Sequence, residues 1–496
     1  MRQELFWWLA ALVMAVVLSA GGALGYVGWS PLLFVLVALL VVARLGAALT
    51  DDRDRSWLPG LLLAAFGAKV LGVLARYFMV TQLYELGDSF SYHRAALDLV
   101  HAWRSLQVPV NTTPGTGTRF TEVVAALLYV PGVESMMMGF LIFASLSFIG
   151  LICFYVAFRG KVPTKGLRTY AMLLFFLPSL LFWPSSIGKD ALMVLFLGVA
   201  SLGASYLLQG RYGMGLLLLA PSLAGAGAIR PHVAVMVVSA LVFTVVLGRR
   251  IGPKGGLGRL VVLVAASIAL FSLAGLAMSE LGLDQESLDE FLAEQERLTG
   301  QGGSAVVGAP VQNPLDFPEA FIRVLFRPLP HEAHNPPALL SSLEGALFLL
   351  LVLWRLPSLW SNIRVIRRYP YLLYSLIYTV QFIVAFSSIL NLGIMARQRV
   401  QVLPLFLALL VGLAWEGRKK VELAPARLAG PVPAMAGTWA SPSGTRLPSS
   451  PSPSGGGLAS SPSPSGGGLG RGSSSSSDER AKGDPWGLHD GQRGAR

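Results

Sequence analysis

The sequence predicts an all-α, polytopic helical membrane protein with about 12 transmembrane helices and with interfacial helices in its outer loops. The chain has 496 residues, of which 53% are hydrophobic and only 13% are charged. A soluble domain carries about 25% charged residues, so this chain has too few to cover a surface that faces water. Apolar runs recur between residues 5 and 416, and each has or approaches the roughly 20 residues that cross a bilayer core.

The apolar runs place the expected spans. These lie at residues 5–24, 31–48, 57–80, 134–158, 169–184, 190–208, 213–229, 232–248, 260–279, 338–354, 370–390 and 400–416. The run at 169–184 is short and ends in Pro184, which predicts a broken or half helix that lines a cavity. The first residues resemble a signal peptide, but no small-residue cleavage site follows the first apolar run, so we expect an uncleaved first helix.

The basic residues predict the orientation of the spans. Four clusters fall on one side of the membrane, at residues 159–168, 249–259, 355–368 and 418–420. The positive-inside rule makes that side the cytoplasm, so we expect a bacterial cell membrane protein with both termini cytoplasmic. The net charge of +12 then reflects topology and contact with anionic lipid, and it does not indicate a nucleic-acid partner.

The chain divides into two parts. Residues 1–420 form the multi-spanning membrane domain, whose outer loops are 81–133 and 280–337. Loops of this length are more often functional than short connections. An amphipathic pattern predicts an interfacial helix at 89–106, and we expect a second interfacial helix at 120–129. Residues 283–298 are predicted to form a third, strongly acidic helix. Residues 421–496 are rich in Pro, Gly and Ser and repeat the decapeptide SSPSPSGGGL, which predicts a disordered cytoplasmic tail.

The first candidate for chemistry is Asp88, which follows a span and begins an expected interfacial helix. A carboxylate here could remove a proton from a sugar hydroxyl during glycosyl transfer, or bind a metal beside a lipid phosphate. Alternatively, Asp88 only caps the helix that follows. Because Tyr92 and His93 follow so closely, we predict that Asp88 and His93 are catalytic and that Tyr92 contacts the substrate.

Two further motifs lie at span ends on the same side. Lys189 could bind phosphate, and Asp190 stands at a helix N-terminus, where negative charge is favoured. Alternatively, Asp190 is a plain cap and Lys189 extends to the interface. Arg230 and His232 lie on the face that the positive-inside rule disfavours for arginine, so we predict that they bind an anion.

The segment 323–334 is dense in polar side chains. His331, His334 and Glu332 could in principle bind a metal, but prolines surround them and their spacing does not match an HExxH helix. We therefore predict that Arg327 and His331 bind phosphate or sugar. No metal ligands are assigned, no cofactor is certain, and a divalent cation remains possible.

Arg397 and Arg399 open the last span from the outer face. Because the planar fork of arginine suits phosphate, we predict that both contact the phosphate of a lipid. Lys69 and Arg76 lie within one span, seven residues apart on one face, and ionisable residues at that depth are usually functional. The alternative is that Lys69 pairs with a buried acid for packing alone.

Four stretches resemble uncharacterised bacterial membrane proteins associated with exopolysaccharide assembly, namely FLPSLLFWPSSIGKDAL, IRPH, LFRPLPHEAHN and NLGIMARQRVQVLP. The acidic residue before an interfacial helix is similar to the GT-C glycosyltransferases, which use polyprenyl-phosphate sugar donors. That resemblance implies Asp88 as the base. The outward arginines are similar to those of O-antigen polymerases and ligases, which implies that Arg230, Arg397 and Arg399 hold a diphosphate. The resemblance covers roughly residues 57–416.

The resemblance implies a membrane glycosyltransferase or polysaccharide polymerase that uses a sugar linked to polyprenyl phosphate or pyrophosphate at the outer face. Its partners would be membrane lipid and polysaccharide assembly proteins. One alternative is a transporter or flippase of a lipid-linked saccharide, although the spans show no internal repeat of the kind that transporters often have. Another is a non-catalytic subunit of an envelope polysaccharide assembly complex.

Overall fold

The computed structural model describes residues 29–83, 87–107, 117–131, 134–159, 164–248, 264, 311, 313–333, 336–363, 366–389 and 391–423. These residues form helices and turns, with no β-strand among them. The expected spans at 5–24 and 260–279, the expected helix at 283–298, His334 and nearly all of the expected tail lie outside the described residues. Residues up to 423 belong to a helix, so the membrane domain extends slightly beyond its expected end at 420.

Five described helices are long and apolar enough to cross a membrane. They are α2 (Trp29–Leu49), α3 (Leu58–Phe78, continued by the π-helical turn η1, Met79–Leu83), α6 (Met136–Phe158), α9 (Lys189–Leu208) and α10 (Tyr212–Ile229). A sixth span is possible where Leu392–Gln401 and Leu403–Leu413 meet at a bend of 61°. The structure therefore supports a helical membrane protein, and about 12 spans are not confirmed.

The remaining helices are shorter or interrupted. Their bounds are α4 (Asp88–Arg104), α5 (Gly117–Tyr129), α7 (Thr164–Phe176), α8 (Pro178–Phe182), α11 (Pro231–Leu247), α14 (Phe317–Phe326), α15 (Pro336–Ile363), α16 (Pro370–Phe386), α17 (Leu392–Gln398) and α18 (Leu403–Leu423), with 3₁₀ turns η2 (Pro314–Asp316), η3 (Pro330–Glu332), η4 (Ile366–Arg368) and η5 (Arg399–Gln401). The structure forms helices α4 and α5 at two of the positions where interfacial helices were expected, and these two helices pack against each other, while their place at the membrane surface stays a prediction. Helix α14 was not predicted. Its Pro318 lies in the first helical turn, where proline is tolerated because its missing N–H would have no partner there.

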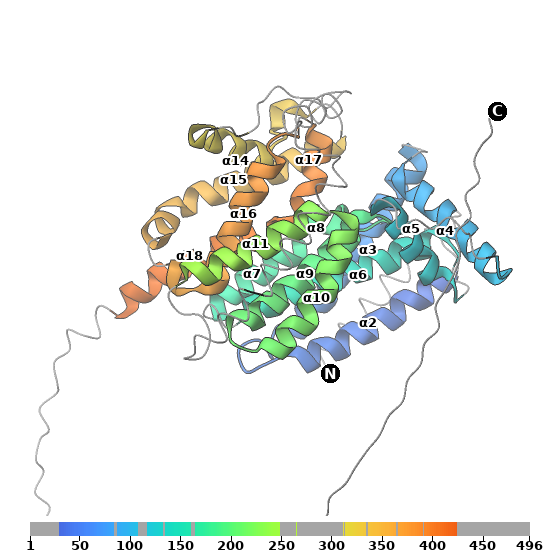
Figure 1. The fold of residues 1–496 in the computed structure, drawn as a ribbon, viewed down its shortest axis with the longest axis horizontal. Coiled ribbons are helices and arrows are strands. Elements are labelled where there is room, and N and C mark those ends of the chain that lie inside the picture. The colour runs from blue at the N-terminus through green and yellow to red at the C-terminus, as the bar shows by residue number, and fades with distance from the viewer. Residues whose placement is uncertain are drawn as a thin grey trace, which may run out of the picture. The chain divides into compact units, whose positions relative to one another are not determined.

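Helices α6, α9 and α10 pack side by side at the centre of the described bundle (Figure 1). The crossing of α6 and α9 is very close, because a Cβ added to Gly198 would lie 2.1 Å from the carbonyl oxygen of Gly150. In a bilayer, lipid tails are as apolar as the helices, so close packing of small residues replaces the hydrophobic effect as the source of helix association. The glycine pair is therefore central to this packing.

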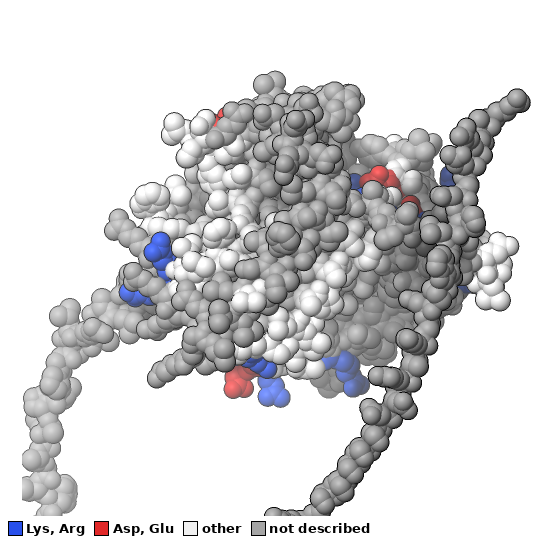
Figure 2. Space-filling model, viewed as in Figure 1, with Lys and Arg blue, Asp and Glu red and all other residues white. Residues whose placement is uncertain are grey.

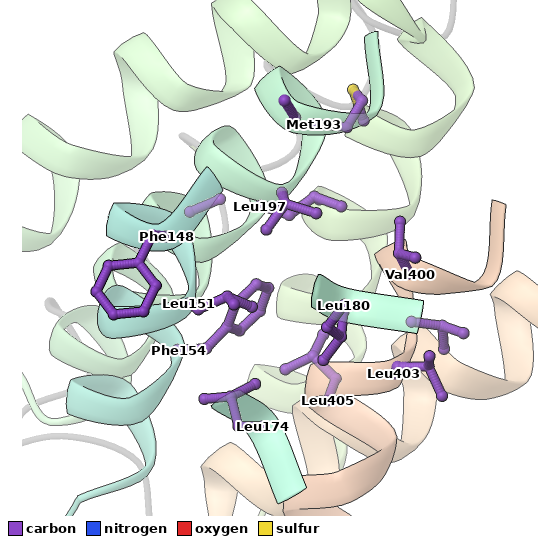
Figure 3. Packing of buried hydrophobic residues seen from close by; sticks show 14 of the residues in the cluster. Phe148, Leu151, Phe154, Leu174, Leu180, Met193, Leu197, Val400, Leu403 and Leu405 are labelled. Carbon is purple, nitrogen blue, oxygen red and sulfur yellow. The ribbon is translucent and has the colours of Figure 1, made fainter. Parts of the chain in front are cut away.

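The interior of the bundle is a continuous apolar cluster (Figure 3). The residues drawn come from α6, α7, α8, α9 and the bent segment η5–α18, and Leu174, Leu180 and Leu403 are all almost fully buried. Outside this interior, much of the described surface in the view of Figure 2 is uncharged, with Lys, Arg, Asp and Glu side chains at its margins. This distribution is the one expected of a chain surrounded by hydrocarbon.

The span expected at 169–184 is broken, as the sequence suggested, into α7 and α8 at Leu177. Two charged side chains from other helices satisfy the backbone at the ends of α8. Lys69 Nζ donates to the carbonyl oxygen of Leu180 at 2.9 Å, which cannot receive the usual i+4 hydrogen bond because residue 184 is proline. At the other end, a Glu344 carboxylate oxygen accepts the N–H of Ser179 at 2.6 Å.

Candidate functional site

Charged side chains from four separate segments meet at one end of the bundle. Asp88 is the first residue of α4, Lys189 and Asp190 begin α9, Arg230 lies between α10 and α11, and Arg397 lies in α17. These five residues, all singled out from the sequence, are called the charged cluster below. The structure thus brings the residues together, while their functional roles stay predictions.

Arg397 joins the two carboxylates of the charged cluster. Its Nη1 donates to Asp88 at 2.9 Å, and its Nε donates to Asp190. The Asp190 side chain is only 6% exposed, whereas that of Asp88 is 60% exposed. Arg397 is therefore anchored by a buried acid on one side and meets an accessible acid on the other.

Arg230 makes the second contact with the buried acid. Its Nη2 lies 3.3 Å from Asp190, and its Nη1 is buried without a hydrogen-bond partner among the described residues. Lys189 is close enough for its charge to interact with Asp88, Asp190, Arg230 and Arg397. Three cations face two carboxylates, so the charged cluster has an excess of positive charge and an unused donor. Such a group can accept an anion.

The turn before α9 packs against α4. The Ser89 hydroxyl donates to the carbonyl oxygen of Ile187 at 2.9 Å, which ties the start of α4 to this turn. A Cβ added to Gly188 would lie 3.8 Å from Tyr92 and 4.0 Å from Arg397, so both side chains border the turn. The pKa of Tyr92 is raised, mainly by burial and then by the Asp88 carboxylate, while the charge of Arg397 and a hydrogen bond with Thr118 oppose the shift. Tyr92 therefore stays protonated as a neutral donor beside the cluster.

The His93 side chain on α4 contacts helix α5. Its Nδ1 is 2.9 Å from the Tyr129 hydroxyl, and the two rings meet edge to face at 5.5 Å. Burial lowers the pKa of His93 and raises that of Tyr129, so both groups are neutral near pH 7. This contact makes His93 part of the α4–α5 interface, which supports a positioning role more than the catalytic role predicted from the sequence.

Arg76 borders the charged cluster from α3. Its guanidinium carbon lies 5.3 Å from the centre of the Phe182 ring and 5.1 Å from that of Trp183, as in cation–π contacts. It is also close enough to Asp190 for its positive charge to stabilise that carboxylate. Lys69, one of the pair predicted with Arg76, instead uses its ammonium group to complete the backbone of α8.

Arg399 and Arg327, the other two arginines predicted to bind substrate, instead donate hydrogen bonds to backbone carbonyl groups and to an acidic side chain of the protein. Arg399 is 1% exposed and donates to the carbonyl oxygens of Leu325 at 3.3 Å and Arg327 at 3.2 Å. Arg327 Nε donates to Glu332 at 2.8 Å. Burial disfavours the ionised form of Glu332, but hydrogen bonds from Arg327 and from the backbone of Leu329 outweigh it and lower the pKa.

The other two predicted histidines differ in position, since His232 is close enough to Arg230 to interact with its charge and His331 is not among the cluster's contacts. His331 is exposed on η3. The His232 ring packs 5.9 Å from the centre of the Phe386 ring on α16. Neither placement tests a binding role directly. Glu344 was not singled out from the sequence, although an acid inside an apolar run was the signal that could have identified it.

Among the described residues, no group of three or more His, Cys, Asp or Glu side chains could hold a metal ion. In the charged cluster, both carboxylates are engaged by arginine. The arrangement therefore favours electrostatic stabilisation of an anion by fixed guanidinium groups, together with one accessible carboxylate. The chain matches no protein-family model, no curated protein and no solved structure.

Proposed function

We propose that this protein is a membrane glycosyltransferase or polysaccharide polymerase that uses a sugar linked to polyprenyl phosphate or pyrophosphate at the outer membrane face. The observation that carries the proposal is the position of Arg397 between the buried Asp190 and the exposed Asp88. This arrangement supplies the two functions that such a transfer needs, a fixed cation for the phosphate and a carboxylate that can take a proton.

The phosphate would bind to the cationic side of the charged cluster. Arg230 has an unused buried Nη1, and Lys189 is adjacent. Asp190 holds both arginines in place, so their donors are positioned before the ligand arrives. Preorganised donors of this kind stabilise the negative charge that develops on a leaving phosphate.

Asp88 would act as the base. In the resting state it accepts a hydrogen bond from Arg397 Nη1. A phosphate oxygen that takes this donor frees the Asp88 carboxylate, which then removes the proton from the acceptor hydroxyl as its oxygen attacks the anomeric carbon. The bond from that carbon to the phosphate oxygen breaks, and the phosphate or pyrophosphate leaves with the bonding electron pair. Binding of the donor substrate is thus coupled to release of the base.

The anion site is tested by binding of inorganic pyrophosphate to the full chain in nanodiscs, measured by calorimetry. Arg230→Ala and Arg397→Lys should each weaken binding by roughly tenfold or more, about 1.4 kcal/mol. Arg94→Ala is the matched control, because Arg94 is an exposed arginine on α4. Equal affinity in all three variants would overturn the assignment of the anion site.

The transfer step is tested by polymer output in cells whose own copy is replaced. Asp88→Asn should abolish output, whereas Asp98→Asn, an exposed acid on the same helix, should leave it unchanged. Full output from Asp88→Asn would exclude Asp88 as the base.

The broken span of α7 and α8 favours a transporter or flippase of a lipid-linked saccharide as the second candidate, since broken helices line many transport sites. Flipping of a fluorescent lipid-linked sugar in proteoliposomes, without sugar transfer, would support this alternative. A non-catalytic subunit is the third candidate and predicts normal output from every charged-cluster variant.

A further inference from the structure

An apolar cavity lies near the charged cluster, and the proposed transfer step does not use it. It has a volume of about 290 Å³ and is enclosed by the end of α3 with its π-helical turn, by α8 with Trp183, and by α15. We call it the lateral groove. Its volume is at the lower end of the range for ligand pockets, so it suits a segment of a chain better than a whole lipid.

The walls of the lateral groove suit hydrocarbon. The aromatic and aliphatic side chains of Phe78, Leu83 and Phe182 line it. Two polar side chains in the wall are already used by the protein, because Glu344 accepts the N–H of Ser179 at 2.6 Å and Ser341 accepts from Arg399 at 2.7 Å. A third, the hydroxyl of Ser179, is buried without a hydrogen-bond partner among the described residues. A sugar has many hydroxyl groups and would find few free partners on such a surface, whereas methylene groups need none.

One layer of side chains separates the lateral groove from the charged cluster. Phe182 and Trp183 line the groove and also stack against the Arg76 guanidinium. Arg76 in turn acts on the Asp190 carboxylate of the cluster. An apolar compartment and an excess of positive charge therefore lie on either side of Arg76, which is the pattern that an amphiphile with an anionic head requires.

The groove is also accessible from the side of the bundle. Phe78 and Leu83 line it and are 47% and 61% exposed. In a chain that spans a membrane, exposed apolar side chains at this position face hydrocarbon. A lipid chain can therefore enter laterally without crossing a polar surface.

We propose that the lateral groove holds the hydrocarbon segment next to the phosphate of an amphiphilic ligand, with Arg76 at the boundary between chain and head. This inference rests on the proposed function, because it takes the charged cluster as the phosphate site. The chemistry recognised is a long hydrocarbon chain esterified to phosphate, which a prenyl phosphate and a phosphatidic acid share.

The test uses the full chain in phosphatidylcholine nanodiscs and a long-chain alkyl phosphate that carries a diazirine near its head. Photo-crosslinks located by mass spectrometry should fall on α8, α15 and the end of α3. Ala75→Trp, which fills the groove from α3, should reduce crosslinking by roughly tenfold. Leu71→Trp is the matched control, since Leu71 is 52% exposed one turn earlier on α3 and does not line the groove.

Inorganic pyrophosphate binding is measured on the same samples, and its retention shows that Ala75→Trp has folded and kept the cluster intact. If pyrophosphate binds normally but crosslinks are unchanged by Ala75→Trp or fall elsewhere, the groove inference is overturned while the proposed anion site stands. If the unmodified protein does not bind pyrophosphate, the proposed function fails first. Leu83→Trp, at an exposed residue of the groove lining, should obstruct entry of the probe and also reduce crosslinking.

A competition experiment identifies which class of lipid supplies the hydrocarbon chain. An unlabelled prenyl phosphate or phosphatidic acid should each displace the probe if the groove recognises only their shared chemistry, and displacement by one alone names the ligand class. Failure of both to displace the probe would show nonspecific labelling and would overturn the inference.

Discussion

Arg397 Nη1 donates a hydrogen bond to the Asp88 carboxylate at 2.9 Å, although 309 residues of sequence separate them. The same arginine also holds the buried Asp190. This pair connects the start of an interfacial helix to the bent segment before the last described helix.

Asp190 is the anchor of the charged cluster, and its loss should destabilise the protein. Asp190→Ala leaves the guanidinium groups of Arg230 and Arg397 without their buried acid, and breaking a buried pair in this way costs about 3–5 kcal/mol. Thermal unfolding in detergent measures the effect. Asp98→Ala, at an exposed position on α4, should change stability by no more than about 0.5 kcal/mol. Equal melting temperatures for the two variants would contradict the anchoring role.

Lys69 supplies the donor that Pro184 lacks. Lys69→Met should leave the Leu180 carbonyl oxygen buried and unpaired, at a cost of about 1–3 kcal/mol. Pro184→Ala introduces an N–H at the position that normally bonds that carbonyl. The double variant should therefore be more stable than the sum of the two single changes predicts, as a double-mutant cycle would show. Simple additivity would mean that Lys69 does not act through this carbonyl.

The α6–α9 crossing depends on the absence of a side chain at Gly198. In Gly198→Ala the new Cβ would meet the Gly150 carbonyl oxygen at 2.1 Å, so the helices must move apart, and such overpacking costs about 1–3 kcal/mol. Gly213→Ala on α10 is the control, because a Cβ there meets nothing within 4 Å. By helix propensity alone, that control should be neutral or stabilising by up to about 1 kcal/mol. Equal loss of stability in both variants would refute the close crossing.

His93 should make stability depend on pH. Burial holds its pKa in the folded protein below the unfolded value, so the unfolded chain binds more protons as the pH falls. Stability from the neutral imidazole is therefore present above the unfolded pKa of about 6.5 and is lost as the pH falls below it. Unfolding measured at pH 7.5 and pH 5.5 should show a smaller loss in His93→Gln than in the native chain. His331→Gln, at an exposed position, should retain the native pH dependence.

Local features of the sequence were sufficient to place most of the described helices. Apolar runs long enough to span hydrocarbon, and the amphipathic pattern of α4, form helices because the backbone in a bilayer must satisfy its own hydrogen bonds. The broken span was expected from the short run that ends in Pro184, and the structure places the break at Leu177. Helix α14 was not predicted, because it has only 10 residues inside the long loop 280–337 and no apolar run of span length marks it. Within the described part of the chain, helix length and composition support five spans, or six with the bent pair.

The sequence by itself determined that this chain is helical and apolar, and it singled out the scarce charged residues at the ends of its apolar runs. Only the tertiary structure decided which of those charges share a site. Arg397 and Arg399 look equivalent in sequence, yet one joins Asp88 to Asp190 and the other donates to buried carbonyl groups. The physical reason is that hydropathy and helix formation depend on neighbours along the chain, whereas the partner of a charge depends on helix packing between segments hundreds of residues apart.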